Sequence, residues 1–238
     1  FKKQVFGLTQ IDLSCYKERQ MKRRIDALIT KCKITSYEEY IRLLKTDKVR
    51  LDEFVAYLTI NVSEFYRNPE QWKLLEDEML PYLFERFGND LHIWSAACST
   101  GDEPYTLVML LAKFIPLDKI HVYATDIDRQ VLEKAQIGIY DEKSLKGLPK
   151  EFVSKYFTQV SDRSYQISDQ IKRCVKFCQH NLLKDRYPKE CDMIVCRNVM
   201  IYFTEEAKKE IYQKFNASLK KDGLLFVCLL YTSPSPRD

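Results

Sequence analysis

Several features are missing from this sequence of 238 residues, and each absence narrows the classes of protein to which it can belong. No uncharged apolar run reaches the roughly eighteen residues that a membrane-spanning helix requires. The first residues, Phe1-Lys2-Lys3, lead into no long apolar segment, so no secretory signal peptide is expected. Together these absences predict a cytoplasmic protein without membrane insertion.

The cysteines lack the spacing of a metal site or of a secreted disulfide scaffold. There are eight of them, but no paired CxxC motif of the zinc-binding kind. Cys174 and Cys178, with His180 nearby, form the single spacing that hints at a metal, and a zinc site needs four ligands. We therefore expect reduced, mostly buried thiols and no metal.

Charge is present but unevenly distributed. The net charge of the chain is only +4, whereas residues 1–50 hold thirteen Lys and Arg against six Asp and Glu, a balance of +7. A basic front end on a nearly neutral body favours an acidic partner surface. The hydrophobic share of 45% is enough for a sizeable buried core.

The first part of the chain has the periodicity of helices. An apolar stripe of Met21, Ile25, Leu28, Ile29 and Cys32 predicts one helix with a basic opposite face. Ser36, followed three residues later by a glutamate, resembles a capping box that opens a second helix. Two more helices are expected over about 50–60 and 69–87, and Gly88-Asn89 ends the region. Residues 1–88 are thus predicted to form an all-α domain.

From residue 89 onward short apolar strands alternate with helices. This alternation predicts βαβ units, a parallel sheet and an α/β Rossmann-like domain over 89–228. Alternating stretches within 157–178 predict a small antiparallel insertion. Residues 229–238 break off after a strand with two prolines, so we interpret them as an aberrant tail. The expected strands lie at residues 91–95, 120–125, 193–196 and 224–227.

The turn after the first strand predicts a nucleoside site. Small residues and Gly101 follow that strand, and Asp126 ends the next one, where a carboxylate can accept hydrogen bonds from ribose hydroxyls. The turn has no GxGxxG and carries Asp102 and Glu103, which would repel a pyrophosphate but suit a cation. S-adenosylmethionine carries two positive groups, so the residues favour it over a dinucleotide. Acids that only stabilise a helix start remain the alternative.

Four motifs resemble those of the CheR-type chemotaxis receptor methyltransferases, in the same order. They are SAACSTGDEPY (95–105), ATDID (124–128), QHNLL (179–183) and CRNVMIYF (196–203). NVSEFYRNP (61–69) resembles the stretch that closes that family's helical domain, and the likeness covers about residues 10 to 228. The resemblance implies a helical domain followed by a class I methyltransferase domain with a small β-subdomain.

The resemblance also implies residue roles. Arg67 and Tyr202 match the residues that address the reacting carboxylate. Ser63 stands where the family often has threonine, and it retains the hydroxyl. The positions that match the family's donor-binding residues are Asn61, Ser63, Arg67, Glu103, Asp126, Asn181, Leu182, Arg197 and Asn198, and Gly101 joins them as the glycine of the turn that lets a ligand approach the backbone.

The activity implied is methyl transfer from S-adenosylmethionine to glutamate side chains of chemoreceptors, with S-adenosylhomocysteine as the product. The partner is then the acidic helical bundle of a receptor's cytoplasmic part, with Arg19, Lys22 and Arg23 as docking residues on a monomeric enzyme. Nucleic acid is disfavoured because the basic face lacks interleaved aromatics. No glycine occurs between Tyr156 and Phe177, where family members that bind a receptor tail peptide have them, so we expect no tether.

Alternatives stay open at this point. One alternative is a catalytically degenerate sensor or scaffold. Another is a methyltransferase for a small molecule or nucleic acid, because fold does not fix substrate. Arg67 has the competing role of an inter-domain salt bridge, and Tyr202 that of a packed aromatic. Trp94 and Phe203 are expected in the core rather than around an adenine.

Overall fold

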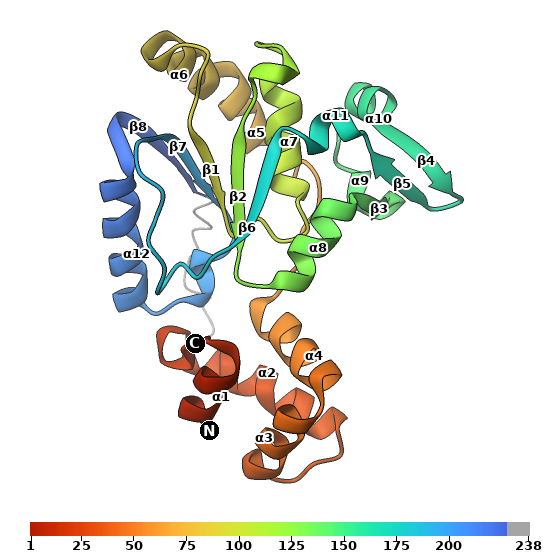
Figure 1. Cartoon of the computed structure of the whole chain (residues 1–238), viewed down its shortest axis with the longest axis vertical. Helices are drawn as coiled ribbons and strands as arrows, with labels where there is room; N and C mark the ends of the chain where they lie inside the picture. Colours follow the sequence, from red (N-terminus) through yellow and green to blue (C-terminus); the bar gives the residue numbers. More distant parts are fainter. Residues whose placement is uncertain (228–238) are drawn as a thin grey trace, which may run out of the picture.

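The computed structural model describes residues 1–227, and four helices gather at one end of it (Figure 1). They are α1 (Lys2–Thr9), α2 (Glu18–Lys31), α3 (Tyr37–Thr46) and α4 (Lys48–Thr59), with a short 3-10 turn, η1 (Leu13–Cys15), after the first. The expected apolar stripe of α2 is buried, and Ser36 Oγ accepts the Glu39 N–H as the predicted N-cap of α3. The α1 helix was not anticipated.

The helix predicted over 69–87 forms, but it does not pack with the helical bundle. It consists of α5 (Pro69–Leu74), a π turn, η2 (Leu75–Met79), and α6 (Leu80–Phe87). Trp72 and Leu83 are fully buried in one hydrophobic core with residues of the sheet, whereas α1–α4 share a core of their own. The division between the two cores therefore falls before Phe65, not at residue 88.

Five parallel strands form the main sheet in the order β6-β2-β1-β7-β8. The chain runs outward from β1 to β2 and β6, then returns to the other side of β1 for β7 and β8. The point where this order reverses lies between β1 and β7, and such a point opens a crevice at the carboxyl ends of the strands. The strands are β1 (Ile93–Ala96), β2 (Val122–Asp126), β6 (Val175–Gln179), β7 (Cys191–Cys196) and β8 (Leu219–Val227).

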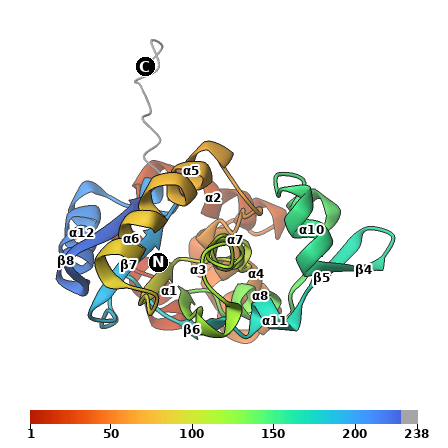
Figure 2. The ribbon, with the colours of Figure 1, turned by 90° about the horizontal axis from the view of Figure 1, so that it is seen from above.

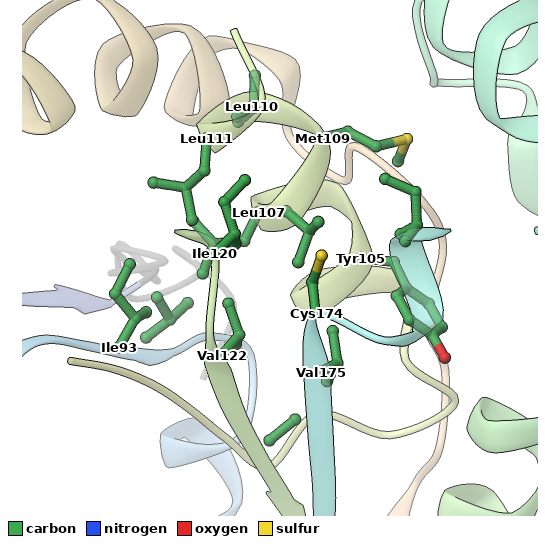
Figure 3. Close-up of a cluster of buried hydrophobic side chains, with 14 of the residues drawn as sticks. Ile93, Tyr105, Leu107, Met109, Leu110, Leu111, Ile120, Val122, Cys174 and Val175 are labelled. Atoms are coloured by element: carbon green, nitrogen blue, oxygen red, sulfur yellow. The ribbon is translucent and has the colours of Figure 1, made fainter. Parts of the chain in front are cut away.

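Helices cover both faces of the sheet because successive strand residues point to opposite sides. Ile93 and Val122 share one hydrophobic core with α7 (Asp102–Leu111), whose leucines lie near Ile120 and Val122 in Figure 3. Trp94 and Ile194 point the other way, into a second cluster with α12 (Glu205–Ser218). The continuously apolar strands of the sequence are thus explained by burial on two sides.

A separate three-stranded antiparallel sheet projects from one side of the molecule (Figures 1 and 2). It contains β3 (Ile139–Asp141), β5 (Ser164–Ile167) and β4 (Phe157–Ser161), in that order. The predicted insertion over 157–178 was wrong at its end, because β6 pairs in parallel with β2 at the edge of the main sheet. An edge strand with one exposed face alternates like a strand of a hairpin, so periodicity alone does not separate the two.

The remaining helices connect these strands. They are η3 (Leu117–Lys119), α8 (Arg129–Ile137), α9 (Glu142–Leu145), α10 (Lys150–Tyr156), α11 (Asp169–Lys172) and η4 (Met200–Tyr202). Within residues 1–227, none of the helices has the length and apolar character needed to cross a membrane. The aberrant tail predicted over 229–238 lies outside the described residues.

Candidate functional site

A cavity opens at the carboxyl ends of β1, β2, β6 and β7, next to the segment that joins α4 to α5. The loops after the four strands supply its walls, as expected for a switch point in an open parallel sheet. Ten of the predicted site residues line it: Asn61, Ser63, Arg67, Glu103, Asp126, Asn181, Leu182, Arg197, Asn198 and Tyr202.

Gly101 is the predicted site residue that does not line the cavity. Its φ of +90° suits glycine, and a Cβ built there would lie 2.9 Å from Ala135 Cβ and 3.1 Å from the Tyr140 hydroxyl. The glycine therefore permits the start of α7 to pack closely on α8. We expected Gly101 to let a ligand approach the backbone, but its Cβ position faces α8 and Tyr140 and not the cavity.

Asp126 is held rigidly at the end of β2. One carboxylate oxygen accepts the Ser99 N–H at 2.8 Å and the other accepts the Asp128 N–H at 3.0 Å. Each oxygen still has a free lone pair, which matches the two adjacent hydroxyls of a ribose. Burial raises the pKa of this carboxyl to about 6, against the lowering effect of its backbone hydrogen bonds.

Glu103 lies in the first turn of α7, beneath the cavity. It accepts a hydrogen bond from Ser95 Oγ at 2.9 Å, and an Arg197 nitrogen lies 3.9 Å from its other oxygen. Burial raises the pKa of Glu103 to about 7, while Arg197 and Ser95 act in the opposite direction. A buried carboxyl with so weak an ion pair is well suited to a cationic ligand.

Arg197 is fixed by its surroundings. Its guanidinium lies 4.7 Å from the centre of the Trp72 ring and donates to Gln71 Oε1 at 3.0 Å and to the Arg67 carbonyl. These contacts tie the loop after β7 to the start of α5. Arg197 therefore fixes the backbone of Arg67 as well as lining the cavity.

The segment before α5 is held to the start of α8 by side-chain hydrogen bonds. Asn61 Nδ2 donates to Asp128 Oδ2 at 2.7 Å, and the Thr59 hydroxyl bonds the same oxygen. Arg67 donates to the Val62 carbonyl at 3.1 Å. Within residues 1–227 Arg67 has no acidic partner within 4.0 Å, which leaves its charge available to a ligand. The inter-domain salt bridge considered for it does not form.

Among the cavity residues that were not anticipated, three have ring side chains. Tyr16 comes from the helical domain, and Phe203, which we expected only in the core, lines the cavity beside it. His180 also lines it, with one ring nitrogen 3.2 Å from the Arg186 carbonyl, and its Nδ1 has no hydrogen-bond partner among residues 1–227. The QHNLL motif was a signal for His180, whereas no sequence pattern connects Tyr16 with residues so far along the chain. Trp94 packs in the core as expected, and its Nε1 donates to Thr125 Oγ1.

The basic residues chosen for docking lie away from the cavity. Arg19, Lys22 and Arg23 are exposed on α2, and in the described part of the chain none forms an ion pair within 4.0 Å. Cys174 is buried with its thiol near the Leu117 carbonyl, and Cys178 is exposed. No group of three potential metal ligands occurs among residues 1–227.

The parallel sheet, its covered faces and the acidic crevice define a Rossmann-like methyltransferase of the S-adenosylmethionine-dependent class. Residues 61–228 match the family described as "CheR methyltransferase, SAM binding domain", and residues 1–59 match "CheR methyltransferase, all-alpha domain". The chain belongs to the CheR methyltransferase family. The predicted family, fold class, enzyme class and methyl donor are thereby confirmed, and the two matched regions meet near residue 60, where the buried cores divide.

Two named relatives in sequence agree with this assignment. The chain is 43% identical over 217 residues to "Chemotaxis protein methyltransferase" of Listeria monocytogenes, covering 91% of this chain and 82% of the relative. It is 34% identical over 231 residues to the protein of that name in Escherichia coli, covering 93% and 79%. A solved S-adenosylmethionine-dependent methyltransferase from Clostridium acetobutylicum superimposes with a TM-score of 0.40 at 15% identity, over 76% of this chain and 57% of that one.

Proposed function

We propose that this enzyme methylates glutamate side chains on the cytoplasmic part of chemoreceptors, and that it therefore works in the cytoplasm. The observation that carries the proposal is the joint placement of Glu103, Asp126 and Arg67 around one cavity. Two carboxyls suited to a cationic nucleoside lie beneath it, and an unpaired arginine suited to a carboxylate substrate lies beside it. This division of charge fits a donor and an acceptor of opposite sign.

The donor pocket follows from the contacts of each residue. Asp126 offers a free lone pair on each oxygen to the ribose hydroxyls, and Glu103 faces the ammonium end. Asn181 and Leu182 line the cavity on the loop after β6, a position that suits contacts to the adenine. Asn61, Ser63, Arg197 and Asn198 complete the walls, and Gly101 supports them through the start of α7.

S-adenosylmethionine supplies an electrophilic sulfonium methyl group, and its transfer leaves neutral S-adenosylhomocysteine. A glutamate side chain is ionised at neutral pH, so the enzyme needs no general base. Its residues must instead align the carboxylate with the methyl group, an effect that removes roughly 7–11 kcal/mol from a barrier in well-oriented systems. Arg67 holds one carboxylate oxygen, and the Tyr202 hydroxyl orients the other.

The partner surface is the exposed basic face of α2. Arg19, Lys22 and Arg23 are unpaired there, so an acidic helical bundle gains favourable contacts without first breaking ion pairs. The enzyme acts as a monomer, since one chain supplies all the residues proposed for donor and acceptor. A receptor-tail tether is not required, in keeping with the lack of glycine in the β4–β5 hairpin.

The competing roles are a degenerate sensor and a methyltransferase for another substrate. Asp126 and Glu103 have the contacts that a donor needs, and Arg67 and Tyr202, which are proposed to hold the acceptor carboxylate, line the same cavity. A base-methylating enzyme would carry an aromatic NPPY-like motif at the end of β7, where this chain has CRNVMIY. Both features favour the protein-glutamate reaction.

Calorimetric titration with S-adenosylhomocysteine tests the donor pocket. We expect the purified chain to bind and Asp126→Ala to lose binding, because both ribose hydroxyls lose their acceptor. Thr46→Ala, which removes an exposed hydroxyl in the helical domain, is the control and should bind like the wild type. Absence of binding by a folded wild-type chain would contradict the proposed function.

A further inference from the structure

The first seventeen residues reach across to the catalytic domain and run beside the loop after β7. Tyr16 and Phe203 form an antiparallel bridge, in which the Lys17 N–H donates to the Tyr202 carbonyl and the Thr204 N–H donates to the Cys15 carbonyl, both at 2.9 Å. In this register the two bridged residues form a non-hydrogen-bonded pair, whose side chains lie on the same side and close together.

The side chains of this pair reach the cavity. The ring centres of Tyr16 and Phe203 are 4.9 Å apart, and both rings line the cavity that also holds Asp126. Burial raises the pKa of the Tyr16 hydroxyl, and the nearby Asp126 carboxylate acts in the same direction. The side chain is half-buried, and in the described part of the chain nothing accepts or donates a hydrogen bond to this hydroxyl, so it is free to bond a ligand in the cavity.

A second contact ties the same segment to the opposite wall. Asn181 Nδ2 donates to the Gln10 carbonyl at 3.0 Å, and Lys184 Nζ donates to Gln10 Oε1 at 2.6 Å. Residues 10–17 therefore hold both the loop after β6 and the loop after β7. These two loops enclose the part of the cavity beside Asp126, where the adenosine half of the donor belongs.

We propose that Tyr16 is a donor-binding residue supplied by the helical domain, and that donor binding and docking of residues 10–17 stabilise each other. The Tyr16 hydroxyl donates a hydrogen bond to the adenosine half of the ligand, and its ring with Phe203 forms an apolar wall against it. This inference rests on the proposed donor pocket. Reciprocity follows by linkage, because a ligand that contacts only the docked state favours that state.

Calorimetry with S-adenosylhomocysteine tests the contact. Tyr16→Phe keeps the ring and the backbone bridge and removes only the hydroxyl, so we expect about a three- to tenfold rise in Kd, the effect of one buried hydrogen bond. Tyr37→Phe is the matched control, because its hydroxyl bonds Asp26 in the same domain and away from the cavity, and its Kd should equal that of the wild type. Equal Kd values for the wild type and Tyr16→Phe would overturn the contact, provided that the wild type binds; if it does not, the proposed function fails first.

Amide hydrogen exchange tests the coupling without any substitution. Saturating S-adenosylhomocysteine should slow exchange at the Lys17 and Thr204 amides, which form the bridge, and leave the amide of Gly88, at the far end of α6, unchanged. Unchanged exchange at both bridge amides in a chain that binds the ligand would overturn the coupling. Because the experiment uses the wild-type chain, a change in exchange cannot come from a misfolded variant.

Discussion

Two buried carboxyls set how the donor pocket responds to pH. Burial raises the pKa of Glu103 to about 7 and that of Asp126 to about 6, so both take up protons in mildly acidic solution. A neutral Glu103 cannot pair with an ammonium group. Ligand binding favours the charged forms and releases protons, so affinity must rise with pH across this range.

We predict that the Kd for S-adenosylhomocysteine falls as pH rises from about 5.5 to 8, by about an order of magnitude, because the Glu103 pKa lies inside this window. Glu103→Gln should bind more weakly at pH 8 and lose most of the pH dependence. Calorimetry over a pH series measures both. A wild-type profile as flat as that of Glu103→Gln would show that this carboxyl does not face the ligand's cation.

The ligand-free protein should show the opposite trend. A carboxyl whose pKa is higher in the folded state than in the unfolded state contributes stability below its unfolded pKa, and this contribution is lost as pH rises through the folded value. Glu103 and Asp126 therefore make the stability of the empty protein fall as pH rises from about 4 to 7. Asp126→Asn should reduce the fall in Tm over that range, as measured by thermal unfolding without ligand.

A substitution at Tyr202 distinguishes an effect on methyl transfer from an effect on donor binding. Its hydroxyl is proposed to orient the acceptor carboxylate, and a hydrogen bond to a charged group contributes about 1.5–3 kcal/mol. We predict that Tyr202→Phe lowers kcat about 10- to 100-fold, while the Kd for S-adenosylhomocysteine changes less than about twofold. An equal loss in both quantities would place Tyr202 in the donor pocket instead.

Among the elements, the start of α7 depends on close packing at Gly101. A side chain there would meet α8 while the backbone adopts a left-handed φ, which costs about 1–2 kcal/mol for a residue other than glycine. Gly101→Ala should lower the stability of the ligand-free protein by at least that amount in chemical unfolding. Gly7→Ala, with open space around its Cβ position, is the control and should not.

The small antiparallel sheet gives a second prediction at this scale. The β4–β5 hairpin has no glycine, so we expect no tight binding of a peptide that matches a receptor's C-terminal tail. Fluorescence anisotropy with a labelled tail peptide and an unlabelled competitor measures this. A Kd in the micromolar range that the competitor abolishes would contradict the absence of a tether.

Particular elements show what the sequence could predict. Asp126 was recognisable because it ends an apolar strand after a turn of small residues, and α2 because its apolar residues share one face. The predicted insertion extended too far because the apolar and polar residues Val175, Lys176 and Phe177 alternate, and this alternation is the same in an edge strand and in a hairpin. Tyr16 was missed because its contact with Phe203 joins two distant segments, which local periodicity does not encode.

At the scale of the whole molecule, the charge of the helical domain is separated from the cavity. The charge-reversal variant Arg19→Glu/Lys22→Glu/Arg23→Glu should raise KM for a receptor fragment at least tenfold, because favourable contacts with an acidic bundle become repulsive. The Kd for S-adenosylhomocysteine should not change. Steady-state kinetics at low and moderate salt measures the effect, which should shrink as salt rises.

The matched control reverses three exposed lysines on the catalytic domain, Lys189, Lys209 and Lys221. It changes the net charge by the same amount at a different surface. If this control raises KM as much as the α2 variant, the effect belongs to total charge, and α2 is not the docking face.

The central claim is methyl transfer to receptor glutamates, and the most direct measurement follows a labelled methyl group. The purified chain is incubated with methyl-labelled S-adenosylmethionine and the cytoplasmic fragment of a chemoreceptor, and the label on the fragment is tested for release as methanol in mild base. We predict base-labile label on the fragment, absent with Asp126→Ala and absent when the acceptor glutamates are replaced by alanine. Label that resists base, or no transfer by a chain that binds S-adenosylhomocysteine, would contradict a protein-glutamate methyltransferase.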